Sequence, residues 1–396
     1  MAGNTIKLAI DANEANTTNR VGSNVYAFEL LMAMSKIVES SQDIVCTLLL
    51  AAPPVSDMPP ATKKWQYKVI GPARFWTQWA LPIFLYRNKG DFQLLFTPGH
   101  YAPQLCPVPY VSSVMDTAYI SHPTHFLLKD YLQLKYWTRF SVRKAQKVIA
   151  ISQSTKNAVI EHYGISPKNV VVAYPGFRTE KTKLSHNQQV LILKQLKVTQ
   201  PFILFIGTIQ PRKNLDKLVE SYEILTHKLW GRKLKSKKNT TITSSPPQLV
   251  IAGKAGWLSQ NILERIKNSP VAKQIIMTGY ITEDQKSALL SNATCTTLLG
   301  TEEGFGIPPL ESMAVGTIPV VANSASLPEV VGDAGYLVSP FNPPEIAETF
   351  YSILNLSAKQ RSILRRKMRQ QINKFSWERT AEVVLAALKE VAGRYT

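Results

Sequence analysis

The sequence predicts an α/β protein made of two doubly wound domains. Apolar, strand-like segments alternate with amphipathic helical segments, and this alternation begins twice along the chain. Such alternation is typical of parallel sheets with helices on both faces. The length of 396 residues also exceeds what one ordinary core needs, which favours two domains.

The first block of alternation opens with a buried strand expected at residues 6–11. A loop at 19–24 and a helix at 25–38 follow, and the apolar residues of that helix recur at helical spacing. Later strands of this block are expected at residues 44–51, 68–70, 94–97, 110–115 and 147–151.

The second block opens with an apolar strand at 202–206, which Gly207 follows directly. Its later strands are expected at residues 248–252, 275–278, 294–299 and 318–321. Two blocks of this kind predict two Rossmann-like domains facing a cleft, with ligands at the carboxyl ends of the strands.

Composition along the chain indicates where the domains end. The N-terminal domain is predicted at residues 1–177, and the polar stretch 178–200, rich in Lys, Gln and Thr, is predicted to be a linker region. The C-terminal domain then spans 201–375, and a last helix occupies 376–396. The stretch 234–248 is poor in apolar residues, and we expect a mobile insertion there.

The overall composition, 45% hydrophobic and 18% charged, is typical of a soluble globular protein. The sequence has no run of 18 apolar residues and its start lacks the features of a signal peptide, so we expect the protein to be cytoplasmic. Three isolated cysteines, Cys46, Cys106 and Cys295, indicate neither a disulfide framework nor a zinc site.

The formal net charge of +19 indicates an anionic partner, which can be a phosphorylated substrate, an anionic membrane face or nucleic acid. Nucleic acid is not expected, because the chain lacks zinc-finger spacing, an RNA-binding aromatic signature and a basic zipper. Basic residues at four-residue spacing are expected along one side of a helix; they are Lys135, Arg139, Arg143 and Lys147. The arginine-flanked aromatic segment 74–87 can also dock on a membrane, but we favour core packing of its aromatics.

The segment 301–311 carries the most informative motif. Two carboxylates, Glu303 and Glu311, enclose a Gly-Phe-Gly turn and a Pro-Pro pair. Because Pro suits the first turn of a helix, the motif predicts a loop with Glu303 and a helix from about Pro308 with Glu311 in its first turn. The glycines let the backbone and its N–H groups approach a ligand closely. Carboxylates beside free N–H donors suit a ligand with many hydroxyls and some negative charge, such as a nucleotide sugar.

Residues 303–322 and 327–334 resemble the donor-site signature of glycosyltransferase family 4, whose members are retaining enzymes of the GT-B fold. The resemblance extends from about Lys7 to the C-terminus and implies that the last helix packs back on the N-terminal domain. It also implies that Glu311 accepts hydrogen bonds from the ribose hydroxyls, and that the backbone near Tyr280 meets the base. The residues expected to hold the transferred sugar are Glu303, Gly304, Phe305 and Gly306.

Two adjacent cations, Arg212 and Lys213, lie at a strand-to-helix turn, where they can meet a diphosphate or simply face solvent. The resemblance favours the first interpretation, because the family has a Gly-x-x-x-Pro-Arg-Lys-Asn segment at Gly207 whose basic residues hold the donor phosphates. Together with Glu303 they form the predicted catalytic set. Such cations would replace a divalent ion, so we expect no metal and no cofactor, and the chain has no Asp-x-Asp. Gly253 is expected either in a turn near the nucleotide or in a plain connection.

In the N-terminal domain, Gly22 lies in a segment that resembles the family's glycine loop beneath the donor phosphates, although Ser23 replaces its second glycine. Asp116 is the acceptor-side candidate. Many relatives carry His-Asp at this position, whereas here Met115 stands where the histidine would be. This departure leaves open how the sugar is oriented and whether the substrate differs.

We therefore expect a retaining, metal-independent hexosyltransferase that uses a GDP- or UDP-sugar, with mannose favoured. Its expected acceptor is a lipid-linked molecule or a polysaccharide, and it can act on the inner membrane face. The alternatives are a GT-B epimerase and a non-catalytic basic binding module on a decayed transferase scaffold. The complete set of Glu303, Glu311, Arg212 and Lys213 argues against decay. The sequence identifies neither the sugar, the base, the linkage nor the oligomeric state.

Overall fold

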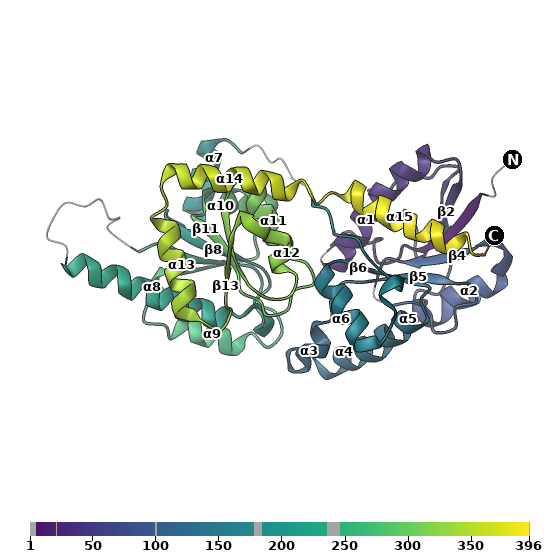
Figure 1. The fold of residues 1–396 in the computed structure, drawn as a ribbon, viewed down its shortest axis with the longest axis horizontal. Coiled ribbons are helices and arrows are strands. Elements are labelled where there is room, and N and C mark those ends of the chain that lie inside the picture. Colours follow the sequence, from purple (N-terminus) through teal and green to yellow (C-terminus); the bar gives the residue numbers. More distant parts are fainter. Residues whose placement is uncertain (1–4, 21, 100, 178–183, 236–245, 396) are drawn as a thin grey trace. The chain divides into compact units, whose positions relative to one another are not determined.

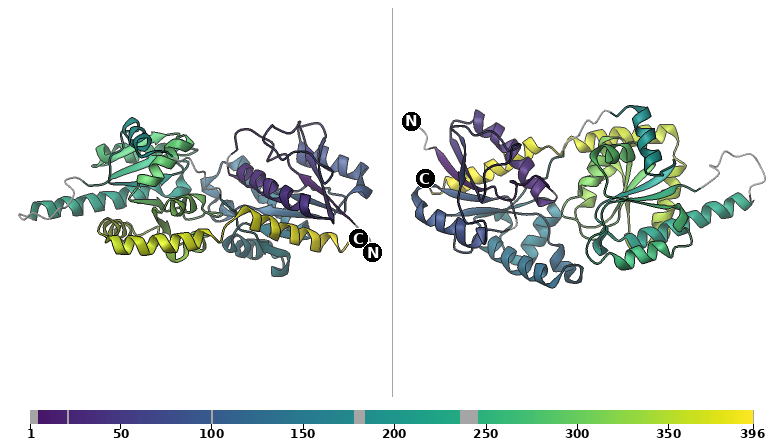
Figure 2. Two further views of the ribbon diagram at one scale, coloured as in Figure 1. Left: turned by 90° about the horizontal axis from the view of Figure 1, so that it is seen from above. Right: turned by 180° about the vertical axis from the view of Figure 1, so that it is seen from behind.

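The computed structural model describes residues 5–20, 22–99, 101–177, 184–235 and 246–395 (Figure 1). Contacts divide the chain into two compact units, one of Met1–Gly176 with Phe375–Thr396 and one of Phe177–Lys374. The first unit contains a seven-stranded sheet of order β3-β2-β1-β4-β5-β6-β7, and the second a six-stranded sheet of order β10-β9-β8-β11-β12-β13. The described strand pairs are parallel, and helices lie on both sides of each sheet (Figure 2). The predicted α/β class is confirmed.

The strands of the first unit are β1 (Ile6–Asp11), β2 (Ile44–Leu50), β3 (Trp65–Val69), β4 (Leu94–Thr97), β5 (Tyr110–Val114), β6 (Lys147–Ala150) and β7 (Val170–Val172). Its α-helices are α1 (Ser23–Ser40), α2 (Leu81–Arg87), α3 (Ala118–Ser121), α4 (Leu128–Gln133), α5 (Arg139–Lys144), α6 (Gln153–Tyr163) and α15 (Trp377–Ala392). Its shorter helical turns are η1 (Trp76–Ala80), η2 (Lys89–Asp91), η3 (Pro123–His125), η4 (Leu134–Thr138) and η5 (Pro167–Asn169).

The strands of the second unit are β8 (Phe202–Ile206), β9 (Gln248–Ala252), β10 (Ile275–Gly279), β11 (Cys295–Leu298), β12 (Ile318–Ala322) and β13 (Tyr336–Val338). Its α-helices are α7 (His186–Gln195), α8 (Leu215–Lys235), α9 (Gln260–Lys267), α10 (Glu283–Asn292), α11 (Ile307–Ala314), α12 (Leu327–Val331), α13 (Pro343–Leu354) and α14 (Ala358–Ile372). Its shorter turns are η6 (Pro211–Lys213), η7 (Ala272–Gln274) and η8 (Gly332–Ala334).

Central strands are buried along most of their length, as their continuous apolar sequences require. Leu8, Ala9 and Ile10 of β1 are at most 1% exposed, and β1 pairs with both β2 and β4. Strands covered on both faces need no alternation of polar residues. This burial agrees with the interior positions of β1 and β8 in their sheets.

Helix α15 belongs to the first unit, although it ends the chain. The Trp377 ring lies 5.7 Å from that of Tyr26 on α1, and Lys389 Nζ lies 2.9 Å from an Asp43 carboxylate oxygen. Chain segments approach closely at Gly176, where an added Cβ would lie 2.1 Å from the backbone nitrogen of Trp377. Only glycine fits there, since neither backbone can move without displacing the helix.

The stretch predicted as a linker differs from the sequence-based expectation. The predicted linker 178–200 contains α7, whose Leu193 is buried in a cluster with Phe202 and Leu204. The second unit thus includes α7 and begins before residue 201. The sequence-based boundary differs because most residues of this helix are polar. Residues 178–183 of this stretch, and 236–245 of the predicted insertion, lie outside the described residues.

The predicted basic stripe is wrong for Lys147. Helix α5 ends at Lys144, where Ala145 takes up extended backbone geometry, so Lys147 is the first residue of β6. Its side chain is buried and paired with Glu390 of α15. Arg143 of α5 stays exposed, and its Nε donates to the Tyr163 carbonyl at 3.3 Å.

Core packing, predicted for the aromatics of residues 74–87, holds for one face only. Trp76 in η1 and Leu81 in α2 are buried, whereas Trp79 and Tyr86 are 65% and 73% exposed. Trp76 donates its indole N–H to Asp11 at 3.1 Å. Within the described residues, no helix is both long and apolar enough to cross a bilayer.

The contact at Gly176 gives a stability prediction. Gly176→Ala should lower the free energy of unfolding by about 1–3 kcal/mol, the usual cost of overpacking. Thermal unfolding followed by circular dichroism measures this. Gly90→Ala is the matched control, because an added Cβ at Gly90 meets nothing within 4 Å. Equal melting temperatures for the two variants would contradict the assigned contact.

Candidate functional site

The loops that follow neighbouring strands of the second unit form the candidate site. In the order β10-β9-β8-β11, the parallel strands bring their carboxyl ends to one edge of the sheet. Gly207 follows β8 with φ +155°, and Gly253 follows β9 with φ +148°. An added Cβ at Gly253 would lie 1.9 Å from the Gly207 carbonyl oxygen. These two predicted residues therefore touch, and glycine is required where they meet.

The three predicted catalytic residues come together at this edge. Lys213 Nζ lies 2.6 Å from Glu303 Oε1, and an Arg212 guanidinium nitrogen lies 3.8 Å from Glu303 Oε2. The cations come from η6, and the carboxylate comes from the loop after β11. The side chains of Lys213, Arg212 and Glu303 are 12%, 21% and 8% exposed, so the cluster is largely buried. Two cations against one carboxylate leave one positive charge in excess.

Two buried polar atoms beside this cluster have no hydrogen-bond partner among the described residues. They are Oε1 of Gln210, which is 4% exposed, and Nε of Arg212. Buried polar atoms are seldom left unpaired, and each unpaired one is costly. This edge of the sheet can therefore donate to, and accept from, a polar ligand.

The loop that carries Glu303 is fixed by Ser326, a residue missed from the sequence. Ser326 is fully buried, and its Oγ lies 2.7 Å from the Glu303 carbonyl oxygen and 2.6 Å from that of Phe305. The Phe305 side chain is itself only 4% exposed, so this residue anchors the loop from within. Gly300 was also missed, although it directly follows a predicted strand. An added Cβ there would lie 2.5 Å from Glu303 Oε1.

Helix α11 begins one residue earlier than expected. Gly306 precedes it with φ +114°, and Pro308 and Pro309 lie in its first turn. The prediction that Glu311 lies in the first turn is therefore wrong, because Glu311 is the fifth residue of the helix. Gly304 lies in the preceding loop as predicted.

Glu311 is paired with Lys286 of α10, a residue that nothing in the sequence singled out. Lys286 Nζ lies 2.9 Å from Glu311 Oε1 and 2.6 Å from a Glu283 oxygen. Burial disfavours the charged form of Lys286, but the two carboxylates outweigh it and raise its pKa. The carboxylate of Glu311 is therefore held in place while remaining 21% exposed.

Tyr280 follows β10 and is 70% exposed. Lys254, which follows Gly253, places its Nζ 4.6 Å from the centre of the Tyr280 ring. This cation–π contact ties together the loops after β9 and β10. Lys254 had not been predicted, since a single lysine after a glycine carries no specific signal.

Asp116 and Gly22, the other predicted residues, belong to the first unit. Asp116 follows β5 and accepts from the Ala118 N–H at 3.3 Å, while Met115 beside it is buried. Gly22 precedes α1 with φ +56°. Asp11 lies at the end of β1 and had not been predicted. Its pKa is raised to about 6, because the effect of burial outweighs that of the hydrogen bonds from Asn13 and Trp76, which lower it.

No group of three or more His, Cys, Asp and Glu residues that could hold a metal ion occurs in the described parts of the chain. The predicted site residues thus fall into a second-unit group around Glu303 and a first-unit group at the end of its own sheet. The carboxylates, the cations and the backbone groups at the glycines of the second unit can together bind a ligand with hydroxyls and phosphates.

Comparison with known proteins identifies the family. The family model "Glycosyl transferases group 1" matches residues 191–375, and the model "Glycosyltransferase Family 4" matches residues 48–181. Both matches are to glycosyltransferases, and together they cover most of the chain.

Curated relatives from Escherichia coli are named as mannosyltransferases. The serotype-specific mannosyltransferase WbdA is 27% identical over 305 residues, which is 74% of this chain and 36% of WbdA. The chain thus spans about a third of that relative's length. The O-antigen chain mannosyltransferase B is 25% identical over 324 residues, which covers 82% of this chain and 79% of the relative.

A solved structure has the same fold. Anabaena Alr3699/HepE, determined in complex with UDP, superposes with a TM-score of 0.68 at 18% identity, over 98% of this chain and all of that one. The two parallel-sheet units and this likeness establish the GT-B fold. The chain thus joins a region of glycosyltransferase family 4 to a region of the group 1 glycosyl transferases.

Proposed function

We propose that this glycosyltransferase is a retaining, metal-independent mannosyltransferase. Its donor would be GDP-mannose, and its acceptor a growing polysaccharide or a lipid-linked glycan at the cytoplasmic face of the membrane. The names of the E. coli relatives support mannose and an O-antigen type of glycan. The UDP in the HepE complex supports a nucleoside diphosphate as the ligand class and keeps the base open to test.

The buried cluster of Lys213, Arg212 and Glu303 is the observation that carries this proposal. A donor diphosphate is anionic, and the cluster has one positive charge in excess. At low local dielectric, that charge interacts strongly with phosphate oxygens. The unpaired Nε of Arg212 provides a further donor.

The cluster also suits the departure of the diphosphate. As the bond between the sugar carbon and the phosphate oxygen breaks, negative charge grows on that oxygen. Lys213 and Arg212 would stabilise this charge without reorganising, because Glu303 and the loop already hold them. In the proposed retaining route, the acceptor hydroxyl attacks from the face that the diphosphate leaves. A diphosphate oxygen then takes the hydroxyl proton, so no separate carboxylate base is needed.

The two carboxylates have different proposed roles. Glu303, beside the cations, would accept hydrogen bonds from the sugar hydroxyls. Glu311, the fifth residue of α11, is held by Lys286 and would accept hydrogen bonds from the ribose hydroxyls. Tyr280 and Lys254 would lie near the base. They follow β10 and β9, on the other side of β8 from the strand β11 that precedes the Glu303 loop.

A donor screen with EDTA-treated enzyme tests the function. Hydrolysis of GDP- and UDP-sugars should be fastest with GDP-mannose and should not need Mg²⁺ or Mn²⁺. Lys213→Ala should slow turnover by about 30- to 1,000-fold, because losing one preorganised donor costs roughly 2–4 kcal/mol. Lys217→Ala is the matched control, since Lys217 pairs with Glu220 instead of Glu303.

Three results of this screen would count against the proposal. An absolute requirement for Mg²⁺ or Mn²⁺ would reject the metal-independent route. Turnover of Lys213→Ala within twofold of wild type would reject the role of the cluster. A clear preference for a UDP-sugar would replace mannose as the transferred sugar while leaving the transferase mechanism in place.

Ser326 offers a test of how the loop holds Glu303. Ser326→Ala removes the hydroxyl whose one proton the Glu303 and Phe305 carbonyls share, so kcat should fall about tenfold, equivalent to about 1.4 kcal/mol. Ser221→Ala is the control: its hydroxyl is equally buried and donates to the Lys217 carbonyl at 2.6 Å. Both variants should lose similar stability, and only Ser326→Ala should lose turnover. Equal kcat values for the two would show that Ser326 is merely structural.

A further inference from the structure

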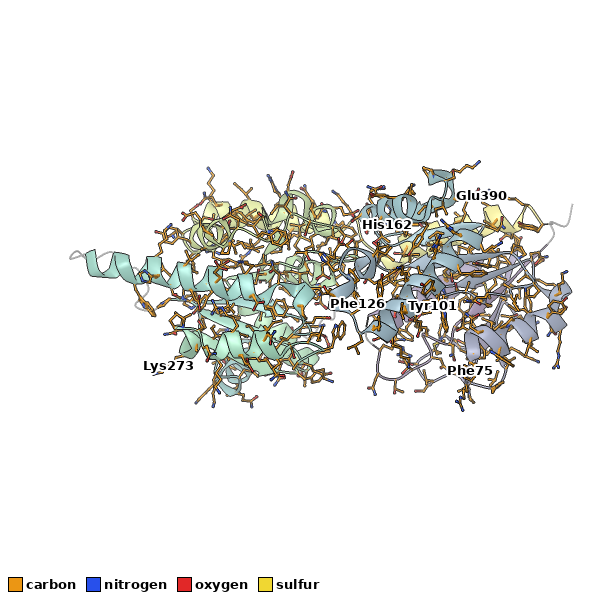
Figure 3. All side chains as sticks on the ribbon, turned by 90° about the horizontal axis from the view of Figure 1, so that it is seen from below. Phe75, Tyr101, Phe126, His162, Lys273 and Glu390 are labelled. Carbon is orange, nitrogen blue, oxygen red and sulfur yellow. The ribbon has the colours of Figure 1, made fainter. Side chains whose placement is uncertain are left out.

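One surface of the first unit presents apolar side chains to solvent in a row. Phe75, which precedes η1, is 64% exposed, and Trp79 of η1 with Ile83 and Tyr86 of α2 are 65%, 48% and 73% exposed. We call these four residues the aromatic face. Phe75 lies at the margin of the first unit in Figure 3. Large contiguous apolar surfaces on a soluble domain usually mark an interaction site.

The aromatic face is held rigidly by the core beneath it. The opposite side of η1 and α2 is buried through Trp76, Leu81 and Leu85, which pack with residues of β1 and β4. The Trp76 indole donates to Asp11. The exposed row is therefore not a frayed segment, because its own helix cannot turn to bury it without losing this packing.

A neighbouring loop extends the apolar surface. The backbone N–H of Gln104 donates to the side chain of Gln78 in η1 at 3.1 Å. Leu105, the next residue, is 81% exposed. The surface thus includes residues from two separate parts of the sequence.

The charged side chains of residues 71–90, which carry the aromatic face, are all basic. Arg74, Arg87 and Lys89 flank it and are exposed, and the sequence 71–90 contains no Asp or Glu. The Arg74 guanidinium lies 5.1 Å from the centre of the Phe75 ring. Aromatic rings and arginines together suit the boundary between lipid headgroups and acyl chains, where rings enter and cations meet phosphates.

We propose that the aromatic face docks this enzyme on an anionic phospholipid bilayer. The inference rests on the proposed function, in which the acceptor is lipid-linked, and it assigns the docking to η1 and α2. The predicted basic stripe is the weaker candidate, because Lys147 is buried in β6 and only Lys135, Arg139 and Arg143 of the stripe are exposed. Docking here would hold the first unit at the surface where a lipid-linked acceptor resides.

Vesicle sedimentation with the full chain tests the assignment. The probes are vesicles of phosphatidylcholine, with and without phosphatidylglycerol, at low and high salt. Wild-type protein should sediment with the anionic vesicles and be released by salt. Arg74→Gln/Arg87→Gln should bind about 30-fold more weakly, because each basic residue at such a surface contributes about 1 kcal/mol.

Two further double variants locate the docking face. Trp79→Ser/Tyr86→Ser should lose at least about tenfold in vesicle affinity, the factor for about 1.4 kcal/mol of lost apolar burial. Leu128→Ser/Tyr136→Ser is the matched control in the same unit, since these residues of α4 and η4 are 71% and 59% exposed. It should bind as wild type does. Donor hydrolysis without vesicles should be unchanged in all three variants.

The contrary outcomes are distinct. The assignment would be overturned if wild-type protein did not bind anionic vesicles at low salt. It would also be overturned if only the Leu128→Ser/Tyr136→Ser control lost vesicle binding. A lipid-free dimer that dissociates in Trp79→Ser/Tyr86→Ser would overturn it too, in favour of a second copy of the chain. Vesicle binding without any sugar transfer would instead contradict the proposed function and leave the docking face standing.

Discussion

The contact between Lys213 and Glu303 is the interaction on which the candidate site depends. It joins residues 90 positions apart in the sequence and buries opposite charges at 2.6 Å. Breaking a buried pair by removing one partner is strongly destabilising, because the other charge stays unpaired. The surroundings accordingly hold both partners: Ser326 fixes the loop of Glu303, and Gly300 leaves room for its carboxylate.

This arrangement links the fold to the proposed chemistry. A parallel sheet places the turns after β8 and β11 side by side, so a cation pair from one turn meets a carboxylate from the other. In the proposed mechanism the excess positive charge would bind the donor diphosphate, and the carboxylate would hold the cations in position beforehand. Preorganisation of this kind is what makes an electrostatic site effective at the moment of reaction.

Much of this could be predicted from the sequence, since the signals are local. Continuous apolar segments identified most of the strands, although the short strands β7 and β13 were not predicted. Glycines directly after strands also marked Gly207 and Gly253 as candidate site residues. Partners such as Lys286 and Ser326 could not be predicted, because only the folded chain brings them to Glu311 and the 303–305 loop. Four-residue spacing also misled the assignment of Lys147, which lies beyond the end of α5.

The aromatic segment shows a different limit. Hydrophobic periodicity alone did not reveal that η1 and α2 are apolar on both sides, with one side in the core and the other in solvent. Exposure separates the two sides, and the flanking arginines then give the outer side a chemical meaning. In the proposed account the first unit would bring the protein to its acceptor, and the second unit would bind the donor.

Calorimetric titration of GDP and UDP into wild type, Lys213→Ala, Glu303→Gln and the double variant tests the central claim most directly. If Lys213 binds the diphosphate and Glu303 orients it, Lys213→Ala should weaken the preferred nucleotide by roughly 1.5–3 kcal/mol. Glu303→Gln should change nucleotide affinity far less, and the two effects should not add, since the residues are in contact. Equal nucleotide affinity in wild type and Lys213→Ala would contradict the account.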